Sequence, residues 1–392
     1  STGVGTAGAQ EESGQAALQE QFRQEMARVR QNPAVREAMR IIEETDDRTI
    51  QDQIELTEIP APPFNEDARA ARYVEMLREV GVDSVWIDAE GNVLGLREGT
   101  IGEETLIFSG HLDTVFPEGT DVTVTQRGDT LFAPGIGDDG RGITTVLAVL
   151  RAMNRAGIRT EDDILFTGTV GEEGLGDLRG MKHLFGPDGP DADAFISVDG
   201  TSARRVTNAG LGSHRYRVTF EGPGGHSWGA FGLVNPHHAL GAAIEDWVDA
   251  ADAYTMDGPR TSYNVGRIGG GTSVNSIPFE SWMEVDMRSH TVETLNGIDS
   301  LFQRAIRRAV DEQNELRREG EPLTVDVEMI GDRPSGLIAP ETPLVQRGMA
   351  ATMELGMEPA LGRSSTDSNI PISMGIPAIT IGGGGEGRGA HS

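Results

Sequence analysis

Apolar residues recur every three to four positions along the first part of the chain, a spacing that predicts amphipathic helices. The period appears at 15–45, where Asn32-Pro33 interrupts it, and again at 50–58, 67–80 and 143–156. Short apolar runs typical of buried strands lie between these segments, at 85–87, 93–96, 106–108, 164–170 and 194–198. Because strands and helices alternate, we predict an α/β layer built on a mostly parallel sheet.

The pattern changes after about residue 210. Residues 214–221 alternate apolar and polar side chains, which predicts a half-exposed antiparallel strand. Further strands are expected at 261–268 and 281–288, and helices at 236–250 and 292–316. The α/β character then returns with a helix at 343–355 and a strand at 377–381. The predicted fold class is therefore α/β. A three-layer α/β/α domain comprises 17–210 and 328–392, and an α+β domain is inserted at 211–327.

The composition narrows the classes of protein that the chain can be. Its 392 residues carry a formal net charge of −29, which argues against nucleic acid as a partner because phosphate binding needs a basic surface. No apolar run approaches the roughly 18 residues of a membrane span, so no membrane partner is expected. The chain has no cysteine. Any bound metal would therefore be held by histidine and carboxylate, which suits zinc, manganese or cobalt.

The first residues of the chain are mostly small or polar. Residues 1–16 contain little apolar material and predict a disordered tail. We interpret this tail as the remnant of an export signal, which favours a periplasmic or secreted protein over a cytoplasmic one.

Acidic residues and one histidine follow the predicted strands or open a helix. They are His111, Asp113, Asp138, Asp139, Glu172, Glu173 and Asp199. Ligands of open α/β sheets gather beyond the carboxyl ends of the strands, so these side chains should converge there. Each pair alone also fits a solvated loop. Carboxylates crowded together repel one another unless cations lie among them, so the whole set predicts a metal site.

Further motifs follow in the second half of the chain. Together the motifs are Ser109-Gly110-His111-Leu112-Asp113-Thr114, Gly137-Asp138-Asp139, Gly171-Glu172-Glu173-Gly174, Asp199-Gly200, Gly224-Gly225-His226-Ser227, Asn275, Arg288 and Ala390-His391-Ser392. In this order they resemble the M20 family of dinuclear metallopeptidases, and the resemblance is strongest to aminopeptidases and tripeptidases like peptidase T. It implies a catalytic metal-binding domain at 17–210 and 328–392, with a lid or dimerisation domain at 211–327.

The resemblance also implies roles for individual residues. The metal ligands would be His111, Asp138, Glu173, Asp199 and His391, holding two divalent ions for which zinc is expected and manganese or cobalt are alternatives. Asp138 would bridge the two ions, and Asp113 would orient His111. Glu172 would be the general base that takes a proton from a metal-activated water. The Asp138–Asp139 peptide is expected to be cis.

The inserted domain would supply the remaining contacts. His226 resembles the histidine that stabilises the developing oxyanion, which in dimeric members of the family acts in the site of the other subunit. Arg288 resembles an arginine that binds a substrate carboxylate, and Asn275 resembles a polar substrate contact. A strand-end arginine is also a common surface charge, and an asparagine before Ser-Ile-Pro is also a common turn residue. A homodimer is expected if His226 acts in trans.

Three departures separate this chain from the family pattern. Arg141 stands one position beyond the place of a common family lysine, the segment before His391 is unusually rich in glycine, and no closing helix follows Ser392. A metal ligand beside a free chain end should fray, so we expect weaker retention of the second ion if this end is native.

The leading function is hydrolysis of the N-terminal peptide bond of short peptides, because an Asp at position 199 accompanies aminopeptidases and dipeptidases in the family. The alternatives are an N-acyl-amino-acid deacylase or carboxypeptidase of the same family, and, more remotely, a non-catalytic binding protein.

Overall fold

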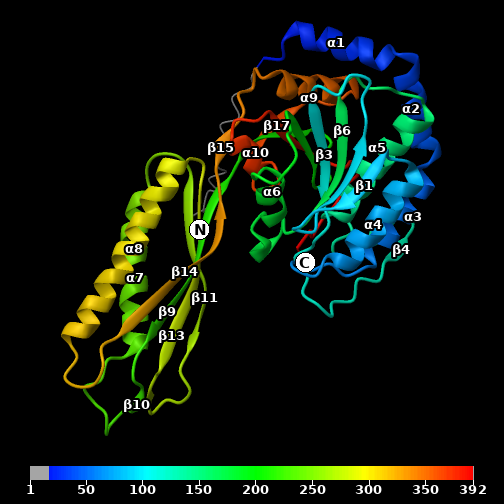
Figure 1. The fold of residues 1–392 in the computed structure, drawn as a ribbon. Helices are drawn as coiled ribbons and strands as arrows, with labels where there is room; N and C mark the ends of the chain where they lie inside the picture. The colour runs from blue at the N-terminus through cyan, green and yellow to red at the C-terminus, as the bar shows by residue number, and fades with distance from the viewer. Residues whose placement is uncertain (1–16, 392) are drawn as a thin grey trace, which may run out of the picture.

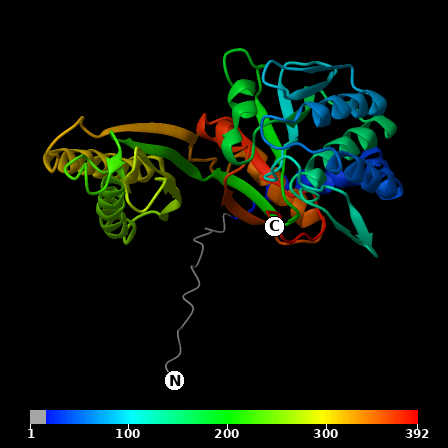
Figure 2. The same cartoon turned by 90° about the horizontal axis from the view of Figure 1, so that it is seen from below.

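The computed structural model describes residues 17–391, which form two domains joined side by side (Figure 1). The tail predicted at 1–16 lies outside the described residues. The larger domain, which we call the main domain, contains both ends of the described chain. The smaller domain, residues 212–333, is inserted between two strands of the larger one and is called the inserted domain (Figure 2).

The main domain is built on a sheet whose strands run in the order β1-β2-β6-β3-β7-β17-β8-β15, with β16 beside β8. Its strands are β1 (Ser84–Ile87), β2 (Val93–Arg97), β3 (Thr105–His111), β6 (Asp163–Thr169), β7 (Ala194–Val198), β8 (Arg205–Gly210), β15 (Gly336–Leu337), β16 (Ala360–Ser364) and β17 (Ala378–Ile381). The central strands β6, β3, β7 and β17 are parallel, and the outer pairings are mostly antiparallel. This confirms the predicted α/β class.

Helices cover both faces of this sheet (Figure 1). They are α1 (Glu20–Gln31), α2 (Pro33–Glu44), α3 (Asp46–Thr57), α4 (Asp67–Val80), α5 (Gly140–Arg155), α6 (Arg179–Leu184), α9 (Pro343–Glu354) and α10 (Asn369–Ser373). One buried cluster joins α3, α4 and α5 to the sheet, and another joins α6, α9 and α10 to it. The amphipathic period creates this packing: Ile143, Val146 and Leu150 of α5 are all fully buried.

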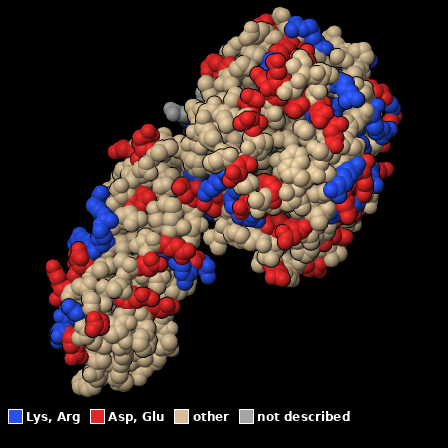
Figure 3. All heavy atoms as spheres, viewed as in Figure 1, with Lys and Arg blue, Asp and Glu red and all other residues tan. Residues whose placement is uncertain are grey.

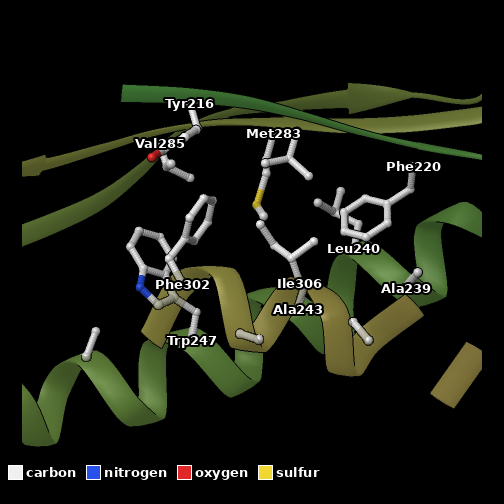
Figure 4. Packing of buried hydrophobic residues seen from close by; sticks show 14 of the residues in the cluster. Tyr216, Phe220, Ala239, Leu240, Ala243, Trp247, Met283, Val285, Phe302 and Ile306 are labelled. Atoms are coloured by element: carbon white, nitrogen blue, oxygen red, sulfur yellow. The ribbon is translucent and has the colours of Figure 1, made fainter. Parts of the chain in front are cut away.

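The inserted domain is a four-stranded antiparallel sheet in the order β11-β13-β9-β14, with two helices on one face. Its elements are β9 (Gly212–Glu221), β10 (Gly225–His226), α7 (Pro236–Thr255), β11 (Thr261–Gly270), β12 (Ser276–Ile277), β13 (Glu280–Ser289), α8 (Val292–Glu315) and β14 (Thr324–Arg333). Trp247 of α7 and Phe302 of α8 pack at 4.7 Å between ring centroids in the core beneath the sheet (Figure 4). The other sheet face carries charged side chains.

The structure corrects several boundaries that the sequence predicted. Strand β3 continues to His111 instead of ending at Phe108, because its pairing with β6 extends to Thr169. Strand β14 runs across the boundary predicted at 327/328, since it stays paired with β9 as far as Arg333. The small and polar residues at 362–369 are typical of a turn, but this segment begins within β16, which pairs with β8. A short hairpin, β4 (Thr125–Arg127) and β5 (Thr130–Phe132), and the strand β8 had not been predicted.

Acidic side chains are spread over both domains on the face shown in Figure 3, in keeping with the net charge of −29. Among the described residues, no helix is both long enough and apolar enough to cross a membrane.

Candidate metal centre

The histidine and acids predicted to converge lie at one edge of the main sheet. His111 is the last residue of β3, Glu172 and Glu173 come three and four residues after the end of β6, and Asp199 directly follows β7. These three strands are parallel neighbours, so their carboxyl ends meet. Asp138 approaches from the loop before α5.

Two groups of three residues share the carboxylate of Asp138. One is His111, Asp138 and Asp199, and the other is Asp138, Glu173 and His391; in each, the candidate ligand atoms lie within 4.8 Å of one another. The Nε2 of His111 is 3.1 Å from Asp138 Oδ1, and the Nε2 of His391 is 3.3 Å from Asp138 Oδ2. The structure thus brings together all five residues that the resemblance assigns to two metals, with Asp138 common to both groups. Glu172 lies beside them, in a third group with His111 and Glu173.

Burial makes this concentration of acid costly without a cation. Burial, together with the neighbouring carboxylate of Asp138, raises the pKa of Glu173 to about 7 and that of Asp199 to about 6. Burial also raises the pKa of Glu172 well above its ordinary value, although Arg333 opposes the shift. Divalent cations would replace the protons that otherwise neutralise these groups. Two imidazoles and three carboxylates without a thiolate therefore fit a pair of ions such as zinc, manganese or cobalt.

Asp113 holds the main chain of the two glutamates. Its Oδ1 accepts the main-chain N–H of Glu172 at 3.0 Å, and its Oδ2 accepts that of Glu173 at 2.8 Å. The Nδ1 of His111 lies 3.1 Å from the main-chain oxygen of Asp113 and 3.6 Å from its carboxylate. Asp113 therefore contacts His111 mainly through its carbonyl oxygen, while its fully buried carboxylate fixes the loop that carries Glu172 and Glu173.

The carboxylate of Asp139 accepts two main-chain N–H groups beside the centre. The Asp138–Asp139 peptide is cis, as expected from the resemblance. The Oδ1 of Asp139 accepts the N–H of Gly142 and so caps α5, and its Oδ2 accepts the main-chain N–H of His111 at 2.9 Å. One buried carboxylate thus connects the start of α5 with the end of β3.

The glycine-rich segment after β17 brings His391 to the centre. The Nε of Arg141 donates to the carbonyl oxygen of Gly383 at 2.9 Å, and the N–H of Gly383 donates to the carbonyl oxygen of Gly200. Arg141 thus contacts the start of the segment that ends at His391. The side chain of His391 is 62% exposed, so this ligand is the least enclosed of the five.

His226 and Asn275 lie together but away from the acidic cluster. His226 ends β10, and Asn275 directly precedes β12, which pairs with β10. Strand β10 lies at the end of the inserted domain away from the main domain (Figure 1), and there Ser227 donates its N–H to the carbonyl oxygen of Asn275. Both residues are exposed, and neither contacts the cluster within the described chain.

Arg288 lies nearer to the cluster than these two residues. Asp286 accepts a hydrogen bond from Arg288 at 2.8 Å on one oxygen and from Arg215 at 2.9 Å on the other. Arg215 in turn donates to the carbonyl oxygen of Gly174, the residue after Glu173. A short chain of hydrogen bonds therefore connects Arg288 with the loop that carries Glu173.

Two buried residues beside the centre were not among the predicted site residues. Arg333, which is 4% exposed, pairs with Glu172 at 3.1 Å. Asp367, which is 1% exposed, accepts a hydrogen bond from Thr169 at the end of β6. By sequence alone, Ser364-Ser365-Thr366-Asp367 fits either a substrate loop or a plain turn. Nothing in the sequence near Arg333 distinguishes it from a surface arginine.

Comparison with known proteins agrees with this geometry. Residues 107–392 match the peptidase family M20/M25/M40. A curated relative from Pyrococcus abyssi, named as a LysW-lysine/LysW-ornithine hydrolase, is 25% identical over 342 residues, which cover 84% of this chain and 83% of the relative.

Two solved structures share the fold. Aminopeptidase PepT from Bacillus cereus is 21% identical, covers 86% of this chain and 90% of its own, and superposes with a TM-score of 0.65. An amidase of the hydantoinase/carbamoylase family from Burkholderia vietnamiensis is 16% identical, with coverages of 86% and 89% and a TM-score of 0.65.

The fold and the relatives that share it define a two-domain hydrolase whose larger domain is built on a mixed, centrally parallel sheet. The match over residues 107–392 shows that the chain belongs to the peptidase family M20/M25/M40.

Proposed function

We propose that this hydrolase is a metal-dependent exopeptidase that removes the N-terminal residue of di- and tripeptides. Two bound divalent ions would lower the pKa of a water molecule and polarise the scissile carbonyl group. Glu172, buried beside the ligands, would accept the proton of that water and pass it to the departing amine. The ligands would be His111, Asp138, Asp199, Glu173 and His391.

The observation that carries the proposed substrate class is the position of Arg288. Arg288 on β13 and Arg333 on β14 both pair with Ser213 of β9, so all three side chains lie on the same sheet face. Two strand spacings, about 10 Å, separate the main chains of the two arginines. Arg333 contacts Glu172, so Arg288 lies on the same sheet face, two strands away from the residue that contacts the proposed base. About 10 Å corresponds to about three residues of extended peptide, which fits a short peptide with a free carboxylate.

The relatives support hydrolysis of amide bonds without choosing the substrate. PepT is an aminopeptidase and the Burkholderia protein is an amidase of the hydantoinase/carbamoylase family, so the fold is shared by enzymes of both kinds. The runner-up function is therefore an N-acyl-amino-acid deacylase or a carboxypeptidase. We favour the aminopeptidase because Asp199, not a glutamate, occupies the ligand position after β7.

The test compares three matched substrates: a free tripeptide, the same tripeptide acetylated at its N-terminus, and the same tripeptide amidated at its C-terminus. We expect rapid release of the first residue only when the amine is free, and turnover that is lost with a chelator and in Glu172→Gln. Amidation should raise KM for the wild type but change little for Arg288→Gln. Preferred cleavage of the acetylated substrate would overturn the proposal in favour of the deacylase.

We further propose that His226 acts in the site of a second copy of the chain. His226 is exposed, and Trp228 and Phe231 close to it are 87% and 70% exposed, which suits a surface covered by a partner. Mixing the inactive variants Glu172→Gln and His226→Ala tests this. Mixed dimers should regain activity, because one site then has both residues. No recovery among verified mixed dimers would contradict action in trans.

A further inference from the structure

Arg333 holds one residue of the main domain from two directions. Its Nη1 donates to the carboxylate Oε1 of Glu172 at 3.1 Å, and its Nη2 donates to the main-chain oxygen of the same residue. Nη1 also lies 2.9 Å from the hydroxyl of Ser365. The planar fork of a guanidinium can make both contacts at once, so it fixes the side chain of Glu172 relative to its main chain.

Both residues of the ion pair are buried. The side chains of Arg333 and Glu172 are 5% and 7% exposed. Removing one member of such a pair leaves the other charge buried without its partner. Loss of one partner should therefore cost more here than at the exposed ion pairs elsewhere on the molecule.

The two residues come from different domains. Arg333 ends β14, which pairs along its length with β9 of the inserted sheet. Glu172 follows β6 of the main sheet, and its N–H is held by Asp113 of the same domain. The orientation of Glu172 thus depends on one anchor in the main domain and one at the base of the inserted domain.

We propose that Arg333 is a positioning residue that orients the carboxylate of Glu172 and makes this orientation depend on the position of the inserted domain. A carboxylate oxygen of Glu172 lies within 4.8 Å of candidate ligand atoms of His111 and Glu173. With Oε1 held by Arg333, the other oxygen would accept the proton of the water. The proposal rests on the proposed role of Glu172 as general base. It does not depend on whether the substrate is a peptide or an acylated amino acid.

The experiment measures kcat, KM, metal content and melting temperature for Arg333→Ala and Arg333→Lys, on whichever substrate the wild type hydrolyses. We expect kcat of Arg333→Ala to fall on the order of 100-fold, within the range ascribed to a positioned base, with KM and metal content little changed. Arg333→Lys should recover part of the loss, because an ammonium can reach Oε1 but cannot reproduce the fork. Added guanidinium ion should raise the rate of Arg333→Ala and leave Glu172→Gln inactive.

Arg363 is the matched control for a purely structural role. It lies at the same junction, but its guanidinium donates to the main-chain oxygens of Gly210, His290 and Gly336 and not to Glu172. Arg363→Ala should lower the melting temperature while kcat falls far less than in Arg333→Ala. If Arg333→Ala does not fold, the kcat of Arg333→Lys relative to that of the wild type tests the positioning role.

Two results would overturn the inference. One is a wild-type kcat in Arg333→Lys or Arg333→Ala, and the other is a loss of kcat in the Arg333 variants that equals the loss in Arg363→Ala. Failure of the proposed function looks different, since Glu172→Gln itself would then remain active. An inactive Glu172→Gln with fully active Arg333 variants would reject the positioning role alone.

Discussion

The guanidinium of Arg215 donates a hydrogen bond of 2.8 Å to the main-chain oxygen of Gly174, the residue that follows Glu173. Arg215 belongs to β9 of the inserted domain, and Glu173 is one of the proposed metal ligands. The contact crosses the junction between the domains. It also continues through Asp286 to Arg288, the proposed carboxylate-binding residue. A change in the inserted domain should therefore alter the position of the loop that carries Glu173.

We predict that Arg215→Ala weakens binding of the ion held by Glu173 about 10-fold, the lower end of what loss of an outer contact to a ligand costs. Titration of the metal-free protein with zinc measures the effect. Arg217 is the control, because it lies two positions along the same face and pairs with Glu284 instead. Equal affinities in Arg215→Ala and Arg217→Ala would contradict the prediction.

Asp113→Asn should damage the centre although it changes few atoms. The carboxylate accepts the N–H groups of Glu172 and Glu173, whereas an amide has one oxygen and would direct its NH2 at the second N–H. An unpaired buried donor costs about 1–3 kcal/mol of unfolding free energy. We also expect kcat to fall about 10- to 100-fold.

Urea unfolding of the metal-free protein and steady-state kinetics of the loaded enzyme measure the two effects of Asp113→Asn. Asp83→Asn is the matched control, since Asp83 also accepts a main-chain N–H, from Glu98, but does so at the surface. A stability loss no larger than that of Asp83→Asn would show that the amide satisfies both donors.

The metal-free protein should become less stable as the pH rises from about 4 to about 7. Burial raises the pKa of Glu173 to about 7 and those of Asp199 and Asp367 to about 6. Unfolded carboxyl groups titrate near pH 4, so between these values the native state binds more protons than the unfolded state. Stability then falls with rising pH until the folded groups have ionised.

Melting temperatures at several pH values, with chelator and with zinc, test this pH dependence. The increase in melting temperature caused by zinc should be largest near neutral pH, where the ion replaces the missing protons. Asp367→Asn should flatten the profile of the metal-free protein. A melting temperature of the metal-free protein that rises from pH 5 to pH 7 would count against the prediction.

The core of the inserted domain offers a test that is independent of the metal. Trp247 is fully buried against Phe302, and its indole N–H has no hydrogen-bond partner among residues 17–391. Trp247→Ala should cost about 3–5 kcal/mol of unfolding free energy, because it leaves a large cavity. Trp247→Phe should cost clearly less, since it keeps an aromatic ring and removes the unpaired N–H.

Urea unfolding followed by circular dichroism measures both Trp247 variants. Met256→Ala, at a side chain that is 81% exposed, is the control and should cost less than about 0.5 kcal/mol. Equal losses for Trp247→Phe and Trp247→Ala would mean that the indole N–H is satisfied in solution.

The helices and strands that were predicted correctly are those in which apolar side chains recur with a single regular spacing. The helix expected at 67–80 is α4, Asp67–Val80, and β7 also has its predicted bounds of 194–198. Strands β8 and β16 were not predicted, because Arg, Asn and Gly interrupt the alternation that marks a strand. Their pairing is decided by neighbours about 150 residues away in the chain, at Arg205 and Ala360.

The site could be predicted in part for a similar reason. Residues such as His111, Asp138 and Glu173 stand at strand ends or helix starts, where local pattern and topology together place them. Arg333 and Asp367 reach the centre only through the pairing of β14 with β9 and the packing of the segment after β16. Local sequence carries no signal for such contacts. The distance between His226 and the cluster likewise follows from the inserted domain's length and direction.

The two ends of the inserted domain meet at one side chain. The amide of Asn369 donates to the carbonyl oxygens of Leu211 at 2.9 Å and Pro334 at 3.0 Å, and beyond them Gly210 pairs with Gly336 in antiparallel register. The chain therefore leaves the main sheet to form the inserted domain and returns to the sheet at an adjacent position. Joining Gly210 to Gly336 by a two-residue turn would convert β8 and β15 into a simple hairpin. The strand order of the main sheet would therefore stay the same if the inserted domain were removed or exchanged for another.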